Sequence, residues 1–201
     1  MRKAKVIQER GAKRREQILI AAIDLIRDGG LDNFSIANLA QRGGISLSTM
    51  YQYYKSIDDV LFDAMRRVST TYHEQIEYAL STEGDAKTKI VAFIETNFRS
   101  DIYSLEFRMV WLAFWAKAPF EPRLQKLSLN MQVEHHKHLA QILTELGVDG
   151  DVEADAFWTF IDGLWLHGTF GKGALTATKA LGLAYTYVER MLGISLRLVK
   201  K

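Results

Sequence analysis

Four tryptophans and one carboxylate in the second half of the chain have the residue types of a site for an organic cation. Trp111 and Trp115 are four positions apart and share one face of a helix, and Trp158, Asp162 and Trp165 follow in another apolar segment. Aromatic faces attract an ammonium group, and Asp162 can supply the opposite charge. The candidate ligand-binding residues are Trp111, Phe114, Trp115, Trp158, Asp162 and Trp165.

Core packing is the simpler interpretation of the same residues. Aromatic side chains at helical spacing often fill a protein core. Asp162 can likewise be a structural carboxylate near a subunit interface, because a buried charge must be paired. The sequence alone leaves both interpretations open.

Three histidines, His135, His136 and His138, raise the question of a metal site, and Glu134 lies one helical turn before His138. The spacing is not that of an H-E-x-x-H motif, the chain has no cysteine, and neighbouring positions of a helix point in different directions. We therefore predict a solvated cluster or a pocket rim here, with no metal and no other cofactor.

A second group of polar residues follows a glycine break at Gly43-Gly44. Ile36 and Leu39 precede the break at helical spacing, and Ser46 is a good N-cap for a short helix that ends near Tyr53. Two short helices joined by a glycine turn are typical of a helix-turn-helix motif, although a Gly-Gly pair alone fits any corner between helices.

The second short helix offers small hydrogen-bonding groups that fit the major groove of DNA. Ser48, Thr49 and Gln52 point outward, whereas Met50 points to the buried side. The candidate DNA-binding residues are Thr49, Tyr51 and Gln52 in the groove, Tyr54 and Lys55 with Arg14 or Arg15 at the phosphates, and Ser35, Ser46, Ser48 and Tyr53 around them.

The distribution of charge supports this assignment. Residues 1–15 hold seven lysines or arginines and one acid, although the whole chain has a formal net charge of only +2. A basic arm just before a helix-turn-helix is the electrostatic feature expected of a protein that binds a polyanion. Double-stranded operator DNA is therefore an expected partner.

The segment from Ile18 to Leu61 resembles the DNA-binding domain of the TetR family of repressors. Ser48 stands where the family often has glycine, and Ile57 stands where many members have a phosphate-binding lysine, so Lys55 and the basic arm have to supply that contact. The resemblance implies a homodimer that binds a pseudo-palindromic operator. It is carried by Ile18, Ala21, Ala22, Leu25, Ile26, Gly29, Gly30, Ser35, Ile36, Leu39, Ala40, Gly44, Ile45, Ser46, Tyr51, Tyr54 and Leu61.

The rest of the chain predicts further helices. After a cap at Ser56 one helix runs to about Leu80, and others follow at 85–99, 104–117, 122–146, 152–170 and 176–197, with caps at Asp85, Ser104, Asp151 and Thr176 and helix ends at Gly147, Gly171 and Gly173. The last two helices are strongly apolar. In the TetR family such helices form the dimer interface, which implies a homodimer through 152–170 and 176–197, where Gly163 and Gly168 permit close approach.

The segment from Phe107 to Gly171 resembles the sensor domain of BetI-type repressors, the choline-responsive branch of the family. Residues 111–116 and 161–166 carry this resemblance. It implies that a quaternary ammonium effector releases the repressor from DNA and that the controlled genes serve osmoprotection. The alternative is a multidrug-type sensor that binds lipophilic cations with the same aromatic residues and controls an efflux gene.

Composition restricts the remaining classes. The sequence has no P-loop, no G-x-S-x-G and no dinucleotide motif, so we predict no enzyme. It also has no apolar run that suits a signal peptide or a membrane span, which predicts a cytoplasmic protein without membrane contact.

We predict an all-α, TetR-like fold. Residues 1–54 would form a three-helix, helix-turn-helix DNA-binding domain with a basic N-terminal arm, and residues 55–201 a helical effector-binding and dimerisation domain. The expected function is a ligand-responsive transcriptional repressor.

Overall fold

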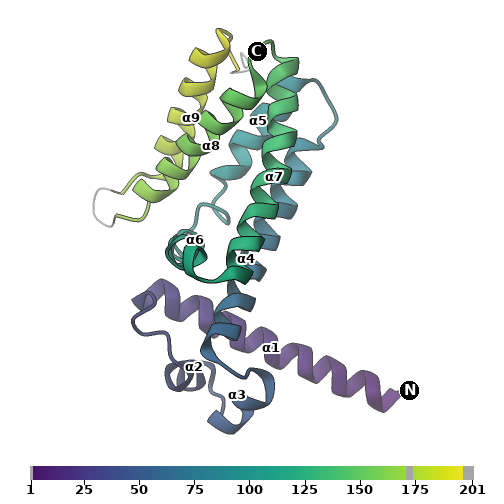
Figure 1. The fold of residues 1–201 in the computed structure, drawn as a ribbon, viewed down its shortest axis with the longest axis vertical. Helices are drawn as coiled ribbons and strands as arrows, with labels where there is room; N and C mark the ends of the chain where they lie inside the picture. The colour runs from purple at the N-terminus through teal and green to yellow at the C-terminus, as the bar shows by residue number, and fades with distance from the viewer. Residues whose placement is uncertain (1, 171–173, 197–201) are drawn as a thin grey trace. The chain divides into compact units, whose positions relative to one another are not determined.

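The computed structural model describes residues 2–170 and 174–196 of the chain (Figure 1). Every regular element among these residues is a helix, which confirms the all-α class. The chain forms two compact units, one of Met1–Ser69 with Met109–Leu124 and one of Thr70–Arg108 with Gln125–Lys201. A functional boundary after residue 54 stays a prediction.

The first unit contains α1 (Arg2–Gly29), α2 (Ile36–Gly43), α3 (Leu47–Tyr53) and the first part of α4 (Ile57–Leu80) (Figure 1). α1 packs on α2, and α2 packs on α3. Gly44 ends α2 with a φ of 60°, a left-handed conformation that favours glycine. The core of the unit consists of Ile18, Leu19, Ala21, Ala22, Leu25, Leu39, Ala40, Ile45, Met50, Tyr54, Val60 and Ala64.

The basic segment at the N-terminus is part of α1, because this helix begins at Arg2. It is therefore not an arm ahead of the first helix. Alanine, lysine, arginine, glutamine and glutamate are good helix formers, and a single interior glycine, Gly11, costs only about 1 kcal/mol. Nothing in residues 2–15 is strong enough to end the helix.

The second unit contains the rest of α4, α5 (Ala86–Asn97), the start of α6 (Leu105–Lys117), most of α7 (Pro122–Glu145), α8 (Gly150–His167) and α9 (Ala177–Leu192). The end of α6 and the short 3-10 helix Ala118–Phe120 belong to the first unit. α8 lies beside α9, and α9 also packs on α5 (Figure 1). Phe93, Phe157 and Val188 are fully buried in the second unit.

Most predicted helix ends agree with the structure. Backbone N–H groups donate to the side chains of Ser46, Ser56, Asp85, Ser104 and Thr176, which confirms these caps. The cap at Asp151 is wrong: α8 begins at Gly150, and the N–H of Val152 donates to Asp149 at 3.3 Å. An N-cap must precede the first helical residue, and Asp151 is already inside the first turn.

The ends of the last two helices differ from the prediction by several residues. α8 ends at His167, and α9 ends at Leu192 because Gly193 takes a left-handed φ of 64°. Gly147, with a φ of 90°, follows the end of α7 as expected. Gly171 and Gly173 lie outside the described residues.

Two glycines permit close packing inside the second unit. A Cβ atom on Gly150 would collide with the carbonyl oxygen of Ala140 and the hydroxyl of Thr144, so α8 begins directly against α7. A Cβ atom on Gly168 would collide with the Tyr103 hydroxyl. No side chain within the described chain approaches a Cβ atom built on Gly163, so its predicted role at a subunit interface stays a prediction.

We expect Gly150→Ala to lower the free energy of unfolding by about 1–3 kcal/mol, because the added methyl meets backbone that cannot move aside cheaply. Gly11→Ala is the matched control: its added methyl meets open space, and alanine raises helix propensity by up to about 1 kcal/mol. Denaturant unfolding of both variants at one protein concentration measures the difference. Equal stability of the two variants would contradict the close α7–α8 contact.

Candidate DNA-binding surface and effector site

α3 exposes one side and buries the other. Tyr51 is 61% exposed and Gln52 and Lys55 are also exposed, whereas Met50 is fully buried. Met50 packs in the core that α1 and α2 share with α3. The outward face of α3 therefore carries side chains that can reach DNA without disturbing the core.

A cluster of hydroxyl groups occupies the first turn of α3. The Ser46 hydroxyl lies 2.8 Å from that of Thr49 and 3.0 Å from that of Ser48, and it accepts the N–H of Thr49. Ser35 has the same capping role at α2, where its hydroxyl accepts the N–H of Asn38. Ser46 and Ser48 are exposed, and Thr49 and Ser35 are half-buried. Each of these residues is thus positioned by local hydrogen bonding.

The structure corrects the phosphate contact predicted for Tyr54. The side chain is only 4% exposed, and its hydroxyl donates to Asp63 at 3.0 Å. Burial, followed by the charge of Asp63, raises the pKa of this hydroxyl well above 10. Tyr51 and Tyr54 would share a face in a continuous helix, but α3 ends at Tyr53. The extended backbone of Tyr54, with a φ of −138°, directs its ring into the core.

Residues of α1 border the same region. Arg14 is half-buried and donates to Gln17, and Gln17 in turn donates to the carbonyl of Gly43 at 2.7 Å. Arg15 is exposed, and its guanidinium lies 5.6 Å from the centroid of the Tyr54 ring. Tyr53 is half-buried against the core. Gln17 was not among the predicted residues, because its hydrogen bond to the turn joins positions 26 residues apart.

Trp165 stands at the centre of an aromatic group in the second unit. It is buried, and its ring centroid lies 5.4 Å from that of Tyr72, 6.3 Å from that of Tyr103 and 6.5 Å from that of Phe107. The Tyr72 hydroxyl donates to the side-chain oxygen of Asn97 at 2.8 Å, which fixes the ring. Tyr72 and Tyr103 were absent from the predicted site.

Trp158, seven residues before Trp165, belongs to the same aromatic group. Its ring stacks on His135 with centroids 5.6 Å apart and meets the edge of Phe93 at 5.2 Å. His135 also contacts Tyr72, at 5.9 Å between centroids, and so connects the surroundings of the two tryptophans. The structure thus brings Trp158 and Trp165 into one group through residues of α4 and α7.

Asp162 lies on α8 between these tryptophans. The side chain is solvent-accessible, yet the surrounding protein removes enough water to raise the pKa of the carboxyl to about 6. Its charge also contributes, after burial, to the raised pKa of Tyr72, so the carboxyl lies within electrostatic range of the Tyr72 hydroxyl. A small ligand can therefore reach a poorly hydrated carboxyl next to aromatic side chains.

The α6 residues of the predicted cage lie in the first unit. Trp111 and Phe114 are buried, with ring centroids 5.2 Å apart, and the half-buried Trp115 lies 6.3 Å from Trp111. These contacts favour core packing for Trp111 and Phe114. Their convergence with the aromatic residues of α8 stays a prediction.

The prediction of a solvated histidine cluster is wrong for His135. This residue is 3% exposed, and burial, together with His73 and His138, lowers its pKa to about 3, so the ring is neutral. The reason is its place in α7, four residues from the buried Met131 and four from the buried Leu139. His136 is half-buried and His138 is exposed, as expected for other faces of the helix.

A surface groove of about 820 Å³ lies between α7 and the start of α8. Its wall includes the carboxylates of Asp149, Asp151 and Asp155, but none of the predicted ligand residues and no tryptophan, tyrosine or phenylalanine. The groove therefore lacks the aromatic faces that cation–π attraction requires.

Two family profiles match the chain. The profile "Bacterial regulatory proteins, tetR family" matches residues 18–64, and the profile "BetI-type transcriptional repressor, C-terminal" matches residues 86–193. The chain belongs to the TetR family. Its C-terminal part is of the BetI type, as the resemblance of the α6 and α8 segments predicted.

Individual TetR-family relatives agree. An HTH-type transcriptional regulator BetI of Burkholderia lata is 29% identical over 186 residues, which cover 89% of this chain and 94% of the relative. BetI of Pectobacterium carotovorum is 27% identical over 186 residues, with the same coverage. Regulators of the TetR family bind DNA and small-molecule effectors and form dimers, so the predicted class of a non-enzymatic transcriptional repressor is confirmed.

Solved structures share the fold. A putative transcriptional regulator from Saccharomonospora viridis in complex with choline has a TM-score of 0.78 and 24% identity, over 89% of this chain and 96% of that one. A putative regulator from Pseudomonas aeruginosa has a TM-score of 0.77 and 18% identity, over 90% and 91%. Within the described residues, no helix is both long and apolar enough to cross a membrane.

Proposed function

We propose that this TetR-family chain is a homodimeric repressor whose effector is choline or a related quaternary ammonium compound, and that its operator controls osmoprotectant genes. The observation that carries the proposal is the accessible and partly desolvated Asp162 carboxyl, which is on the same helix as Trp158 and Trp165 and within electrostatic range of Tyr72. The BetI-type profile over residues 86–193 supports the same effector class.

The chemistry of a quaternary ammonium group suits this arrangement. Such a group has no N–H to donate, so a protein binds it through aromatic faces and a nearby negative charge. Tyr72, Trp158 and Trp165 supply the rings, and Asp162 supplies the charge. A carboxyl that is already partly desolvated loses little further hydration when the cation arrives.

The proposed DNA contacts are made by α3 and α1. Thr49 and Gln52 would contact base edges, Tyr51 would lie at the groove with its hydroxyl on a phosphate beside it, and Lys55, Arg14 and Arg15 would contact further phosphates. Ser35 and Ser46 hold the two helix starts, and Ser48 and Tyr53 support α3. We assign DNA binding to residues 1–54 and effector binding with dimerisation to residues 55–201.

α8 and α9 supply the proposed subunit interface. Ala180, Ala184 and Val188 are fully buried and form the inner face of α9, while Leu183 on another face is 46% exposed. Phe160 stacks on Tyr187 with centroids 4.5 Å apart, and both remain half-buried. Apolar surface left uncovered on two adjacent helices suits a two-fold contact with a second copy.

The proposal predicts that choline releases the protein from DNA. Genomic fragments retained by the purified protein supply the operator, and fluorescence anisotropy of that DNA measures release during titration. We expect choline to act at concentrations at which its neutral isostere, with carbon in place of nitrogen, has no effect, because the attraction depends on charge.

The same titration separates the alternatives. Equal release by a broad panel of lipophilic cations would support the multidrug-type sensor instead. Equal action of choline and the neutral isostere would contradict recognition through charge. Absence of release by any ammonium compound would exclude this effector class.

A further inference from the structure

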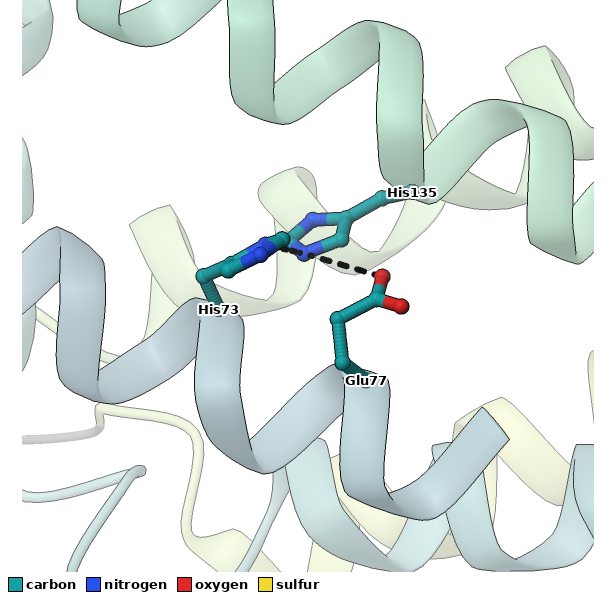
Figure 2. A group of neighbouring side chains, drawn as sticks. All are labelled: His73, Glu77 and His135. Atoms are coloured by element: carbon teal, nitrogen blue, oxygen red, sulfur yellow. Dashed lines mark hydrogen bonds and ion pairs between the residues drawn. The ribbon is translucent and has the colours of Figure 1, made fainter. Parts of the chain in front are cut away.

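Three potential metal ligands meet between α4 and α7, next to the aromatic group. His73 and Glu77 are one turn apart on α4, and His135 projects toward them from α7 (Figure 2). Nδ1 of His73 lies 2.8 Å from Nε2 of His135, and Oε1 of Glu77 lies 3.9 Å from the same nitrogen. One ligand atom from each residue lies within 4.8 Å of the other two.

The distances between these ligand atoms are close to the distances between the ligand atoms of a bound metal ion. Two nitrogen ligands at about 2.1 Å from a tetrahedral zinc ion lie roughly 3.4 Å apart. The two distances from Nε2 of His135 fall on either side of this value, and the three ligand atoms lie within 4.8 Å of one another, so small movements of the side chains would place all three on one ion. Two imidazoles and one carboxylate are also a donor set that zinc takes when it keeps one open position.

Two further side chains contact the candidate ligands His73 and Glu77. Nε2 of His73 lies 3.5 Å from a carboxylate oxygen of Glu134, and Nδ1 of His138 lies 2.8 Å from Oε2 of Glu77. A histidine that binds a metal through one nitrogen usually directs its other N–H to a carboxylate, which fixes the ring. His73 and Glu134 have this relation.

The orientation of His135 is also fixed. Its ring stacks on Trp158 and meets the ring of Tyr72 at an interplanar angle of 82°. Because the His135 ring is buried between these neighbours, it has little freedom to rotate, and its Nε2 stays directed toward His73. The ligand is therefore oriented before an ion arrives, which lowers the cost of binding.

The hydrogen bond between His73 and His135 does not explain the position of Glu77, the third residue of the cluster. Oε1 of Glu77 is buried and accepts no hydrogen bond from a described residue. A buried carboxylate oxygen without a donor is costly, and a divalent cation among these three side chains would satisfy it. The unsatisfied oxygen is thus a separate indication of a missing positive ligand.

We propose that His73, Glu77 and His135 bind one divalent transition-metal ion of the zinc class. The fourth position would be open to water or a small ligand. The ion would join α4 to α7 within the second unit. The proposed ligands are other residues than those assigned to the ammonium effector, although His135 stacks on Trp158 of that group.

The test uses the full-length protein without a histidine tag, after treatment with a chelator. Cobalt(II) titration monitored by visible absorption should show saturable uptake of about one ion per chain with intense bands of four-coordinate geometry, and zinc should displace it. His73→Gln and Glu77→Gln should each weaken uptake at least about tenfold. His136→Gln is the matched control, because His136 lies on α7 beside His135 but pairs with Asp155.

Three results would overturn the proposal: absence of stoichiometric uptake by the natural protein, undiminished uptake by both His73→Gln and Glu77→Gln, or equal loss in His136→Gln. Circular dichroism in the presence of chelator establishes whether each variant is folded. If a variant does not fold, X-ray absorption of the natural protein with zinc decides, because it must show two imidazole ligands per ion.

Discussion

Asp162→Asn is expected to weaken choline binding at least about tenfold at pH 8 and to remove most of its pH dependence. The substitution keeps the shape of the side chain but removes the charge that raises the pKa of Tyr72. The aromatic rings remain, so weak binding through cation–π attraction should persist. Isothermal titration with choline measures the affinity.

The pH dependence follows from the pKa of the same carboxyl. Desolvation by the surrounding protein raises this pKa to about 6 in the free protein, and a bound cation favours the ionised form and so lowers it. Choline affinity should therefore be constant above about pH 7 and should fall by up to about tenfold per unit below pH 6, where a proton must leave before the cation binds.

Asp155→Asn is the matched control for this prediction. Asp155 is on the same helix, but its carboxyl is 81% exposed and pairs with His136. Its substitution removes the same formal charge from α8 and should change choline affinity by less than about twofold, because exposed charges are well screened. Equal losses in the two variants would indicate a general electrostatic effect and contradict a direct contact at Asp162.

Tyr51→Phe is expected to lower operator affinity by about 10- to 100-fold, whereas Tyr54→Phe should leave it unchanged. Both substitutions delete one hydroxyl from a tyrosine in or next to α3. Tyr51 is exposed and free to bond with DNA, and a hydrogen bond to a charged group contributes about 1.5–3 kcal/mol. The Tyr54 hydroxyl is buried and bonded to Asp63.

The two substitutions should affect the stability of the protein in the opposite way. Tyr54→Phe should lower the free energy of unfolding by about 1–3 kcal/mol, because Asp63 loses a buried partner, and Tyr51→Phe should leave it nearly unchanged. Anisotropy with operator DNA and denaturant unfolding of the two variants give both quantities. Loss of operator affinity in Tyr54→Phe without loss of stability would restore the phosphate contact that the structure excludes.

Local signals predicted the fold well, because short-range chemistry sets most helix ends. Gly44 predicted the end of α2, Ser46 predicted the start of α3, and Ser56 predicted the start of α4. The wrong predictions came from one helix start that two residues could cap and from a helical spacing that continues beyond the end of its helix. Asp149 and Asp151 both suit a cap, and Tyr54 follows the helical spacing of Tyr51 although the helix has already ended.

The candidate site was predictable only in part. Asp162 and the tryptophans of α8 stand out by residue type, and His135 could have been placed in the core from its spacing to Met131 and Leu139. The meeting of His73 with His135 joins positions 62 residues apart, and no periodicity within one helix reports such a contact.

The position of Arg15 affects how the repressor responds to salt. Its guanidinium lies 3.8 Å from Asp63, so part of its charge is already balanced within the protein. Each arginine or lysine that neutralises a DNA phosphate releases about 0.9 of a condensed counterion, and that release makes binding weaker as salt rises. Because Arg15 has a carboxylate of its own, it contributes less to this release. Operator affinity should then fall less steeply with rising salt concentration than the number of lysines and arginines at the DNA would predict.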